Sequence, residues 1–361
     1  MGRILFILPA LPDFEPYVFG YIKIADECKV DYDVICWNRK GEDVSFPDNY
    51  YVYQHPTSDL YTPVRKMIEI TGFSSFVRRV LRKNKYSLVF TFTIADSVFL
   101  APLLTRKYRG NYVFDIRDYS PIVDSPFFKP SFRFLLSHSA INVISSEGFK
   151  NWLPDKYEYL LCHNTDIDKI KESLKYSKPI ANKQDINILT IGALRDVISN
   201  TRIVDAFANR KNVLVSFVGD GNATPLLRRY CEEHNVINVS FHGRYHKEDE
   251  DGFVEKCDLM NLLMPHNSVS DFLMSNRFYL AARLRKPMIV NDNCFQARQV
   301  EKYGLGIVVK ESEQLNDVVE SYYKSIDWQA LDDNCIRFLN DVYDEQTHFR
   351  KIIKRIITER N

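Results

Sequence analysis

The regular alternation of short apolar runs with amphipathic stretches most constrains how this chain can fold. Apolar, β-branched runs at residues 3–10, 32–38 and 87–93 are separated by stretches with helical periodicity, such as 18–28 and 95–108. Strands that are apolar on both faces are typical of parallel sheets covered by helices. The sequence therefore predicts an α/β protein built from doubly wound, Rossmann-like sheets.

The alternation is interrupted once, which predicts two domains. Residues 167–185 are polar and lysine-rich, and strand-like runs resume at 186–194. At roughly 150 residues per domain, 361 residues also suggest two. We expect an N-terminal domain at 1–180, a second domain at 181–335 and a C-terminal helix at 336–361. Sheets of this kind bind ligands beyond the carboxyl ends of their strands, so two such domains are expected to face each other across a ligand-binding cleft.

Composition excludes several classes of protein. The formal net charge is +1, so no overall field favours nucleic acid or a membrane. The seven cysteines form no CxxC pair, which indicates reduced core thiols and a cytoplasmic location. No apolar run approaches the ~18 residues that span a bilayer, and a signal peptide is not expected. The eight histidines are scattered, so no metal site is predicted.

Two local patterns indicate an anion site in the second half. The strand-like run at 212–218 leads into Gly219 and Gly221 and then a helical stretch, a turn that serves either a ligand phosphate or simple chain reversal. The stretch SNRFYLAARLRKP, residues 275–287, places Arg277 in the first turn of a helix that Ser275 is expected to cap. A cation there is repelled by the helix dipole unless an anion lies between them. Arg277 is thus either an exposed, harmless residue or part of a phosphate site.

The order and spacing of four elements in the second half carry a family resemblance. These elements are Val218–Gly221, Val239–Gly243, Cys257–Leu259 followed by 275–287, and the segment VEKYGLGIVV at 300–309. Together they resemble the family-4 glycosyltransferases of the GT-B fold. A looser likeness in the first half rests on 114–121, 143–153 and 162–168. The whole set is most similar to bacterial transferases of capsular, exopolysaccharide or O-antigen biosynthesis.

The resemblance implies a GT-B fold with the donor site in the second domain and a final helix that packs back on the first. It implies a nucleotide-sugar donor as substrate, no cofactor, no metal and retention of anomeric configuration. Cations and helix N-termini would then stabilise the charge on the leaving diphosphate. Against the alternative of solvated surface residues, the expected donor-binding residues are Gly192, Arg195, Arg202, Gly219, Gly221, Gly243, Arg244, Ser275, Asn276, Arg277 and Tyr279.

Acceptor-side residues are expected in the first domain. Asp118, at the end of a strand-like run, is a candidate to orient or deprotonate an acceptor hydroxyl, or else caps a turn. Its neighbour Arg117 is expected to bind a phosphate of donor or acceptor. Phe14, Glu15 and Tyr17, in the loop after the first strand, either line the acceptor site or pack the loop.

Three positions depart from the family pattern. Leu280 stands where a glutamate often holds the donor, and Ala193 and Ile198 stand where two phosphate-binding cations are usual. These departures leave open a relative that binds nucleotide sugars, or acts as a scaffold, without catalysis. A further alternative is another sugar-nucleotide enzyme on the same fold, such as a 2-epimerase.

The stretch 62–86 is basic and amphipathic. It either presents an ordinary solvated face or lies on an anionic membrane surface, where a lipid-linked glycan acceptor would be found. The basic residues are local and lack aromatic stacking motifs, so nucleic acid is not an expected partner. The predicted protein is a cytoplasmic glycosyltransferase that acts at the inner face of the membrane on a growing, lipid-linked glycan.

Overall fold

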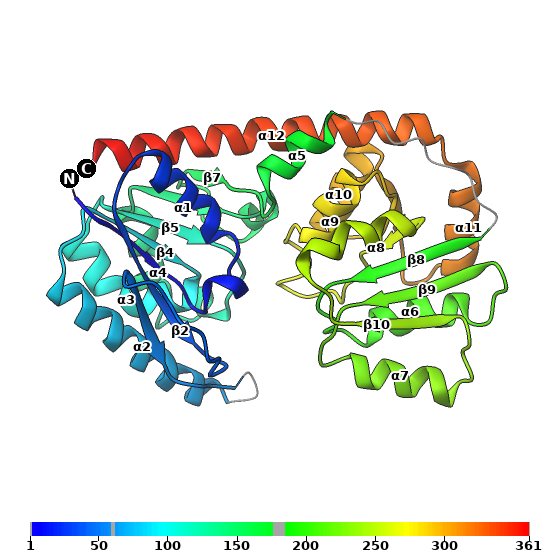
Figure 1. Cartoon of the computed structure of the whole chain (residues 1–361), viewed down its shortest axis with the longest axis horizontal. Helices are drawn as coiled ribbons and strands as arrows, with labels where there is room; N and C mark the ends of the chain where they lie inside the picture. The colour runs from blue at the N-terminus through cyan, green and yellow to red at the C-terminus, as the bar shows by residue number, and fades with distance from the viewer. Residues whose placement is uncertain (1, 59–61, 176–184, 361) are drawn as a thin grey trace. The chain divides into compact units, whose positions relative to one another are not determined.

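The computed structural model describes residues 2–58, 62–175 and 185–360, and it divides into two compact units (Figure 1). Unit 1 comprises the chain up to residue 164 together with residues from 345 onward, and unit 2 comprises residues 165–344. The division expected at residue 180 falls within 176–184, outside the described residues. The chain passes from unit 1 to unit 2 after Asn164, and it returns after Asp344.

Unit 1 contains a parallel sheet of seven strands in the order β3-β2-β1-β4-β5-β6-β7. Strand order reverses between β1 and β4, so the loops that follow these two strands diverge at the carboxyl edge and leave room for a ligand. The strands are β1 (Ile4–Ile7), β2 (Tyr32–Asn38), β3 (Tyr50–Gln54), β4 (Leu88–Phe92), β5 (Tyr112–Ile116), β6 (Ile141–Ile144) and β7 (Tyr159–Leu161).

Helices cover both faces of this sheet. On one face, α1 and the C-terminal part of α12 enclose a core that includes Phe6, Tyr21 and Phe90. Aromatic pairs such as Trp37 with Phe73 join the other face to two further helices, and a third packs against β4 and β5. The elements are α1 (Val18–Glu27), α2 (Pro63–Lys83), α3 (Ile94–Lys107), α4 (Lys129–His138) and the short turns η1 (Pro12–Phe14), η2 (Pro121–Val123) and η3 (Glu147–Asn151).

Unit 2 repeats the same order in six parallel strands, β10-β9-β8-β11-β12-β13. The strands are β8 (Ile186–Ile191), β9 (Val213–Val218), β10 (Val239–Gly243), β11 (Leu259–Asn261), β12 (Met288–Asn291) and β13 (Gly306–Val309). Residues of α6 (Ile198–Phe207), α7 (Thr224–Glu233) and α11 (Leu315–Ser325) cover one face. The other face packs against α5 (Ile167–Ser173), α8 (Glu250–Lys256), α9 (Asn276–Arg283) and α10 (Phe295–Tyr303), and η4 (Lys247–Asp249) precedes α8.

The final helix, α12 (Trp328–Glu359), belongs to both cores. Leu331 and Phe338 are buried in unit 2, whereas Phe349 and Ile353 are buried in unit 1. The helix begins eight residues before the C-terminal helix that was expected at 336–361.

Several local expectations were wrong or incomplete. Residues 167–173 of the expected linker form α5, because the Asp166 side chain accepts from the Asp168 N–H at 2.9 Å and Ile170 is buried in the core. Strand β3 and helices α4 and α11 were not anticipated. All seven cysteines are free, and six of them are buried, as the scattered spacing predicted.

Candidate functional site

Three loops at the carboxyl edge of the unit 2 sheet are hydrogen-bonded to one another. The Gly192 N–H donates to Val218 O at 2.9 Å, and the Gly219 N–H donates to Gly243 O at 2.7 Å. A Cβ at Gly219 would lie 2.0 Å from Gly192 O, and its φ of +121° favours glycine. A Cβ at Gly221 would lie 2.2 Å from Leu194 O. These contacts require glycine where the backbones cross, so the turn has a structural role whether or not it binds a ligand.

Arg277 lies in the first turn of α9, at the same edge. Part of its surface remains accessible, yet protein surrounds the guanidinium and this burial lowers its pKa. Within residues 185–360, no hydrogen bond or ion pair of this guanidinium is found, and the charges of Tyr245 and Asp196 offset only part of the fall in its pKa. A desolvated arginine without a counter-ion at a helix N-terminus is the arrangement expected for an anion site.

The other predicted cations differ in their hydrogen bonds and ion pairs. Arg195 is exposed, and no hydrogen bond or ion pair joins it to any residue in the described part of unit 2. Arg202 donates from Nη2 to Lys310 O and so ties α6 to the end of β13. Arg244 is exposed and forms an ion pair with Asp220 at 3.4 Å.

The start of α9 differs in detail from the expectation. Ser275 occupies the N-cap position but does not cap the helix, because its hydroxyl donates to Gln296 Oε1 at 2.6 Å. The helix N–H groups therefore receive no side-chain acceptor from Ser275. Asn276 is exposed at the same helix start, whereas Tyr279 is buried and stacks on Phe338 at 6.2 Å. That position favours a packing role for Tyr279.

The three departures from the family pattern occupy distinct environments. Leu280 is buried in the hydrophobic core of unit 2, so its side chain serves packing. Ala193 and Ile198 are exposed beside the loop after β8. Sequence reasoning missed Asp196, whose carboxylate accepts from the N–H of Ser199 at 2.8 Å and thereby caps α6. The sequence signal that could have identified Asp196 is an acidic residue just before a stretch with helical periodicity.

In unit 1, a buried ion pair lies at the carboxyl end of β5. Arg117 Nη2 donates to Asp115 Oδ2 at 2.5 Å, and the Tyr21 hydroxyl donates to the same oxygen at 2.6 Å. Burial lowers the pKa of Arg117, but Asp115, Cys162 and Tyr21 together raise it more, so the pKa lies above its ordinary value. The guanidinium also lies over the Tyr17 ring at 4.4 Å. Arg117 is itself buried.

The same arginine is connected to the C-terminal helix. Its Nη2 lies 3.3 Å from Cys162 Sγ, and Gln346 Nε2 of α12 lies 3.8 Å from that sulfur. Gln346 Oε1 accepts from the His163 N–H at 3.0 Å. Cys162 and Gln346 were absent from the sequence-based site, because the two residues are 184 positions apart.

Carboxylates gather around the loop after β1. Burial raises the pKa of Glu15 to about 7, the nearby Tyr17 lowers it, and the charge of Asp118 raises it further. Asp96, at the start of α3, is buried with a raised pKa that Arg39 partly offsets. The groups that act on the pKa of Glu15 are thus Tyr17 and Asp118, together with Arg39 and Asp96, which the sequence did not single out.

Thr93 and Phe14 belong to the loops at the carboxyl edge of the unit 1 sheet. Thr93, between β4 and α3, has φ +64° and ψ 151°, a strained backbone for a β-branched residue. Its hydroxyl donates to Asp96 Oδ2 at 3.0 Å. Phe14 is exposed, with Lys40 Nζ lying 3.7 Å from its ring centroid. Strain of this kind clusters at functional sites.

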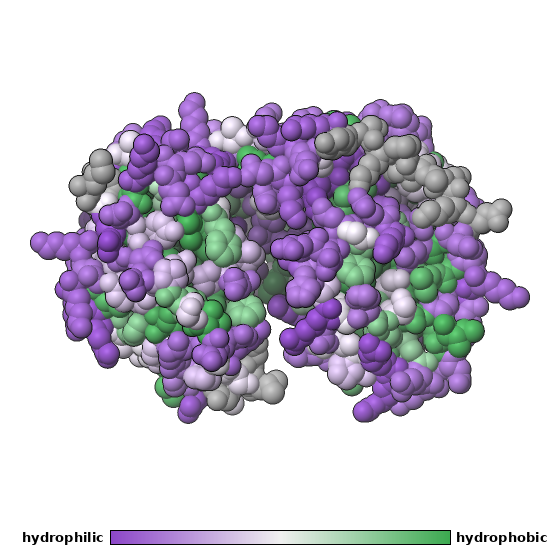
Figure 2. Space-filling model, viewed as in Figure 1, coloured by the Kyte–Doolittle hydropathy of each residue, from purple (hydrophilic) through white to green (hydrophobic). Residues whose placement is uncertain are grey.

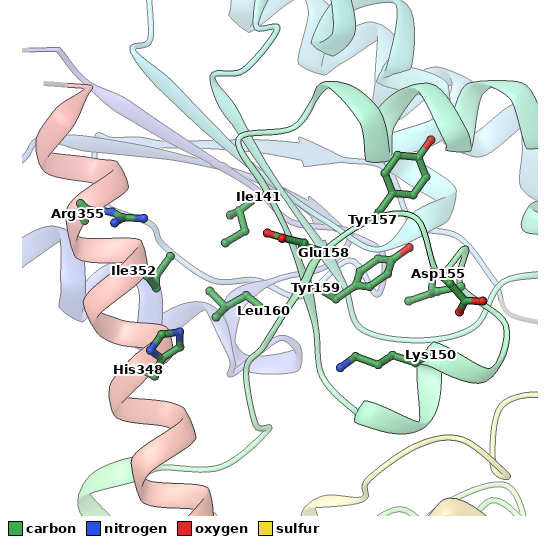
Figure 3. Close-up of a pocket in the computed structure, with 11 residues that line it drawn as sticks. Ile141, Lys150, Asp155, Tyr157, Glu158, Tyr159, Leu160, His348, Ile352 and Arg355 are labelled. Carbon is green, nitrogen blue, oxygen red and sulfur yellow. The ribbon is translucent and has the colours of Figure 1, made fainter.

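Unit 1 also has a separate pocket of about 620 Å³ beside β7 (Figure 3). Its lining includes Tyr157, Glu158 and Tyr159 near the sheet edge, and His348 and Arg355 on α12. No predicted site residue lines it. Within the described residues, no group of three or more histidines, cysteines or carboxylates is arranged to hold a metal ion.

The fold of this chain matches solved structures at low sequence identity. Neither a family model nor a curated protein matches the sequence. Sucrose-phosphate synthase from Thermosynechococcus elongatus superposes with a TM-score of 0.72 at 12% identity over 99% of this chain and 100% of that chain. Anabaena HepE, solved with UDP, gives 0.67 at 14% over 99% of each chain.

The fold is GT-B. The lipopolysaccharide glycosyltransferase WaaG has the same architecture, with a TM-score of 0.60 at 14% identity over 97% of this chain and 99% of that chain. The predicted fold class is therefore confirmed: two Rossmann-like domains with parallel sheets and alternating helices. In residues 2–58, 62–175 and 185–360, no helix has both the length and the apolar character needed to cross a bilayer.

Proposed function

We propose that this protein is a glycosyltransferase that moves a sugar from a nucleotide-sugar donor to an acceptor hydroxyl. The observation that carries the proposal is Arg277, a desolvated arginine without an ion-pair partner among the described residues of unit 2, at the start of α9. Solved GT-B structures support a nucleotide-sugar donor, since HepE was crystallised with UDP and with UDP-glucose.

In unit 2, the diphosphate of the donor would bind Arg277 and N–H groups at the start of α9. Arginine suits this role because it donates two parallel hydrogen bonds to phosphate oxygens. Arg195, in the loop after β8, would add a second contact. As the bond between the sugar and the phosphate breaks, the diphosphate leaves with the bonding electrons, and these donors stabilise its charge without a metal.

In unit 1, Glu15 and Asp118 would bind the acceptor. An acceptor hydroxyl forms the new glycosidic bond and gives up its proton, and a carboxylate near it can orient the hydroxyl or take that proton. The raised pKa of Glu15 brings its titration close to neutral pH. Arg117 and Asp115 hold the end of β5 in place beneath this site.

The finer proposal follows the family resemblance. The enzyme would be a family-4-like transferase of bacterial surface polysaccharide synthesis that retains anomeric configuration and uses neither metal nor cofactor. Its acceptor would be a growing, lipid-linked glycan, reached from the cytoplasmic side of the membrane, with residues 62–86 in contact with the bilayer.

The direct test is calorimetric titration of the full chain with UDP-, GDP-, ADP- and CMP-sugars. One of them should bind saturably, and Arg277→Ala should weaken that binding by roughly 10- to 100-fold, because a hydrogen bond to a charged group is lost. Arg229→Ala, an exposed arginine in the same unit, should leave the affinity unchanged. The proposal fails if no nucleotide sugar binds.

A second candidate is a nucleotide-sugar binder without transferase activity, or another sugar-nucleotide enzyme of the 2-epimerase type. The favouring observation is that Leu280 is buried in the core where the family resemblance leads us to expect a carboxylate, and Ile198 is exposed where a cation is usual. Release of free sugar from a bound donor would support a transferase, and isomerisation of the sugar an epimerase. Binding with neither reaction, even with glycan acceptors added, would support the binder.

A further inference from the structure

Three helices on one face of the unit 1 sheet carry almost no acidic residues. Helices α2, α3 and α4 hold ten cationic side chains and two acids, a formal charge of +8, whereas the whole chain carries only +1. Both acids, Glu69 and Asp96, are buried. The exposed charged side chains of these helices are all cations, namely Arg65, Lys66, Arg79, Arg82, Lys83, Arg106, Lys107, Lys129 and Arg133. We call this set the basic layer.

The basic layer is one continuous structure. Helix α2 packs against α3, and α3 packs against α4. Arg78 Nη2 donates to Phe99 O at 2.7 Å, and Lys107 Nζ donates to Leu81 O at 2.8 Å. These two hydrogen bonds link α2 to the middle and to the end of α3. The cations of three helices therefore belong to one rigid surface, which residues 62–86 alone do not describe.

Exposed apolar side chains accompany these cations. Val64 and Ile68, one turn apart at the start of α2, are 68% and 59% exposed, with Met67 beside them. Phe127, just before α4, is 80% exposed, and Phe134 of α4 is 56% exposed. Hydrophilic side chains cover most of the face seen in Figure 2, and hydrophobic ones form separate patches.

We infer that the basic layer binds the surface of an anionic lipid bilayer, with phosphate headgroups on its arginines and lysines and with Phe127, Phe134 and the start of α2 at the headgroup level. Cations attract anionic headgroups, and exposed aromatic and aliphatic side chains enter the interface. A nucleic acid would use the cations but would leave aliphatic residues such as Val64 and Ile68 exposed to water. The combination therefore favours lipid.

The inference deepens the membrane contact of the proposed function, from a single stretch of sequence to a three-helix surface selective for anionic lipid. It can be tested without donor or acceptor. Sedimentation of the full chain with phosphatidylcholine vesicles, and with vesicles rich in phosphatidylglycerol, should show binding to the second only, weakened by added salt because charge attraction is screened.

Matched charge reversals test the surface itself. The triple variant Arg79→Glu, Arg82→Glu and Arg133→Glu should lower partitioning to anionic vesicles by roughly a hundredfold. A second triple variant, Lys211→Glu, Arg229→Glu and Lys256→Glu, changes the same charge at exposed positions of unit 2 and should stay within about twofold of the wild type. Equal losses in both triples would show a net-charge effect and overturn the inference.

A matched pair of substitutions tests the contribution of the apolar side chains to vesicle binding. Phe127→Ser should weaken vesicle binding roughly tenfold, whereas Ile237→Ser, at an equally exposed position of unit 2, should not.

Tighter binding to duplex RNA or DNA than to anionic vesicles at the same salt would replace lipid with nucleic acid and overturn the proposal. Nucleotide-sugar titration of the Arg79/Arg82/Arg133 variant separates the two hypotheses, because intact donor binding with lost vesicle binding leaves the donor site in place.

Discussion

Arg117 and Asp115 form a buried ion pair across one intervening residue of the chain, at the end of β5, with 2.5 Å between Nη2 and Oδ2. The Tyr21 hydroxyl and Cys162 complete the surroundings of this pair. Arg117 lies over the ring of Tyr17, in the loop that carries Glu15, and Asp118 follows Arg117 in the chain, so loss of the pair would affect both stability and acceptor binding.

Removing one partner should therefore be costly. Arg117→Leu leaves the Asp115 carboxylate buried without its counter-charge, and we expect unit 1 to lose about 3–5 kcal/mol of unfolding free energy. Denaturant unfolding monitored by hydrogen exchange of unit 1 would measure this. Arg133→Leu, an exposed arginine of the same unit, should change stability by less than about 0.5 kcal/mol. Similar values for the two variants would contradict the buried role of the pair.

The raised pKa of Glu15 predicts a pH-dependent stability of unit 1. The folded state holds this proton up to about pH 7, whereas the unfolded chain releases it near the ordinary value of 4.5. Unit 1 should therefore lose stability as pH rises through that interval, and Glu15→Gln should flatten the loss. Unfolding measured across the interval provides the test, with Glu158→Gln, at an exposed position, as the control. Unchanged pH dependence in Glu15→Gln would refute the assignment.

Gly221, in the turn after β9, can be compared with a glycine that meets no obstacle. Gly221→Ala places a Cβ 2.2 Å from Leu194 O, so the backbone must move, at a cost of about 1–3 kcal/mol and with weaker nucleotide-sugar binding. Gly252→Ala in α8 meets nothing within 4 Å and should stabilise the helix by up to about 1 kcal/mol. Thermal unfolding and titration of both variants would show whether the turn needs glycine.

Arg195 and Arg202 should behave in opposite ways. Arg195 is exposed and joined to no described residue by a hydrogen bond, so Arg195→Ala should weaken donor binding while the melting temperature stays constant. Arg202→Ala removes the hydrogen bond to Lys310 O and should cost about 0.5–1.5 kcal/mol in stability with a small effect on the donor. The reverse outcome would exchange their roles.

The alternation of apolar runs was sufficient to predict the doubly wound sheets, because period and burial are local properties of the chain. Strands β1, β2 and β4 in the first half and β8 and β9 in the second half lie where apolar runs predicted them. Strand β3 escaped prediction because its five residues are half-exposed at a sheet edge and lack a continuous apolar pattern.

What the sequence determined by itself was the α/β pattern, the glycine turns after the strands and a cation at the start of α9. Tertiary structure decided what those residues meet. It sends the Ser275 hydroxyl to Gln296, buries Tyr279 in the core and assembles the basic layer from three helices. The physical reason is that the periodicity of apolar residues is a property of neighbouring positions in the sequence. Burial, charge pairing and pKa instead depend on partners brought together from distant parts of the chain.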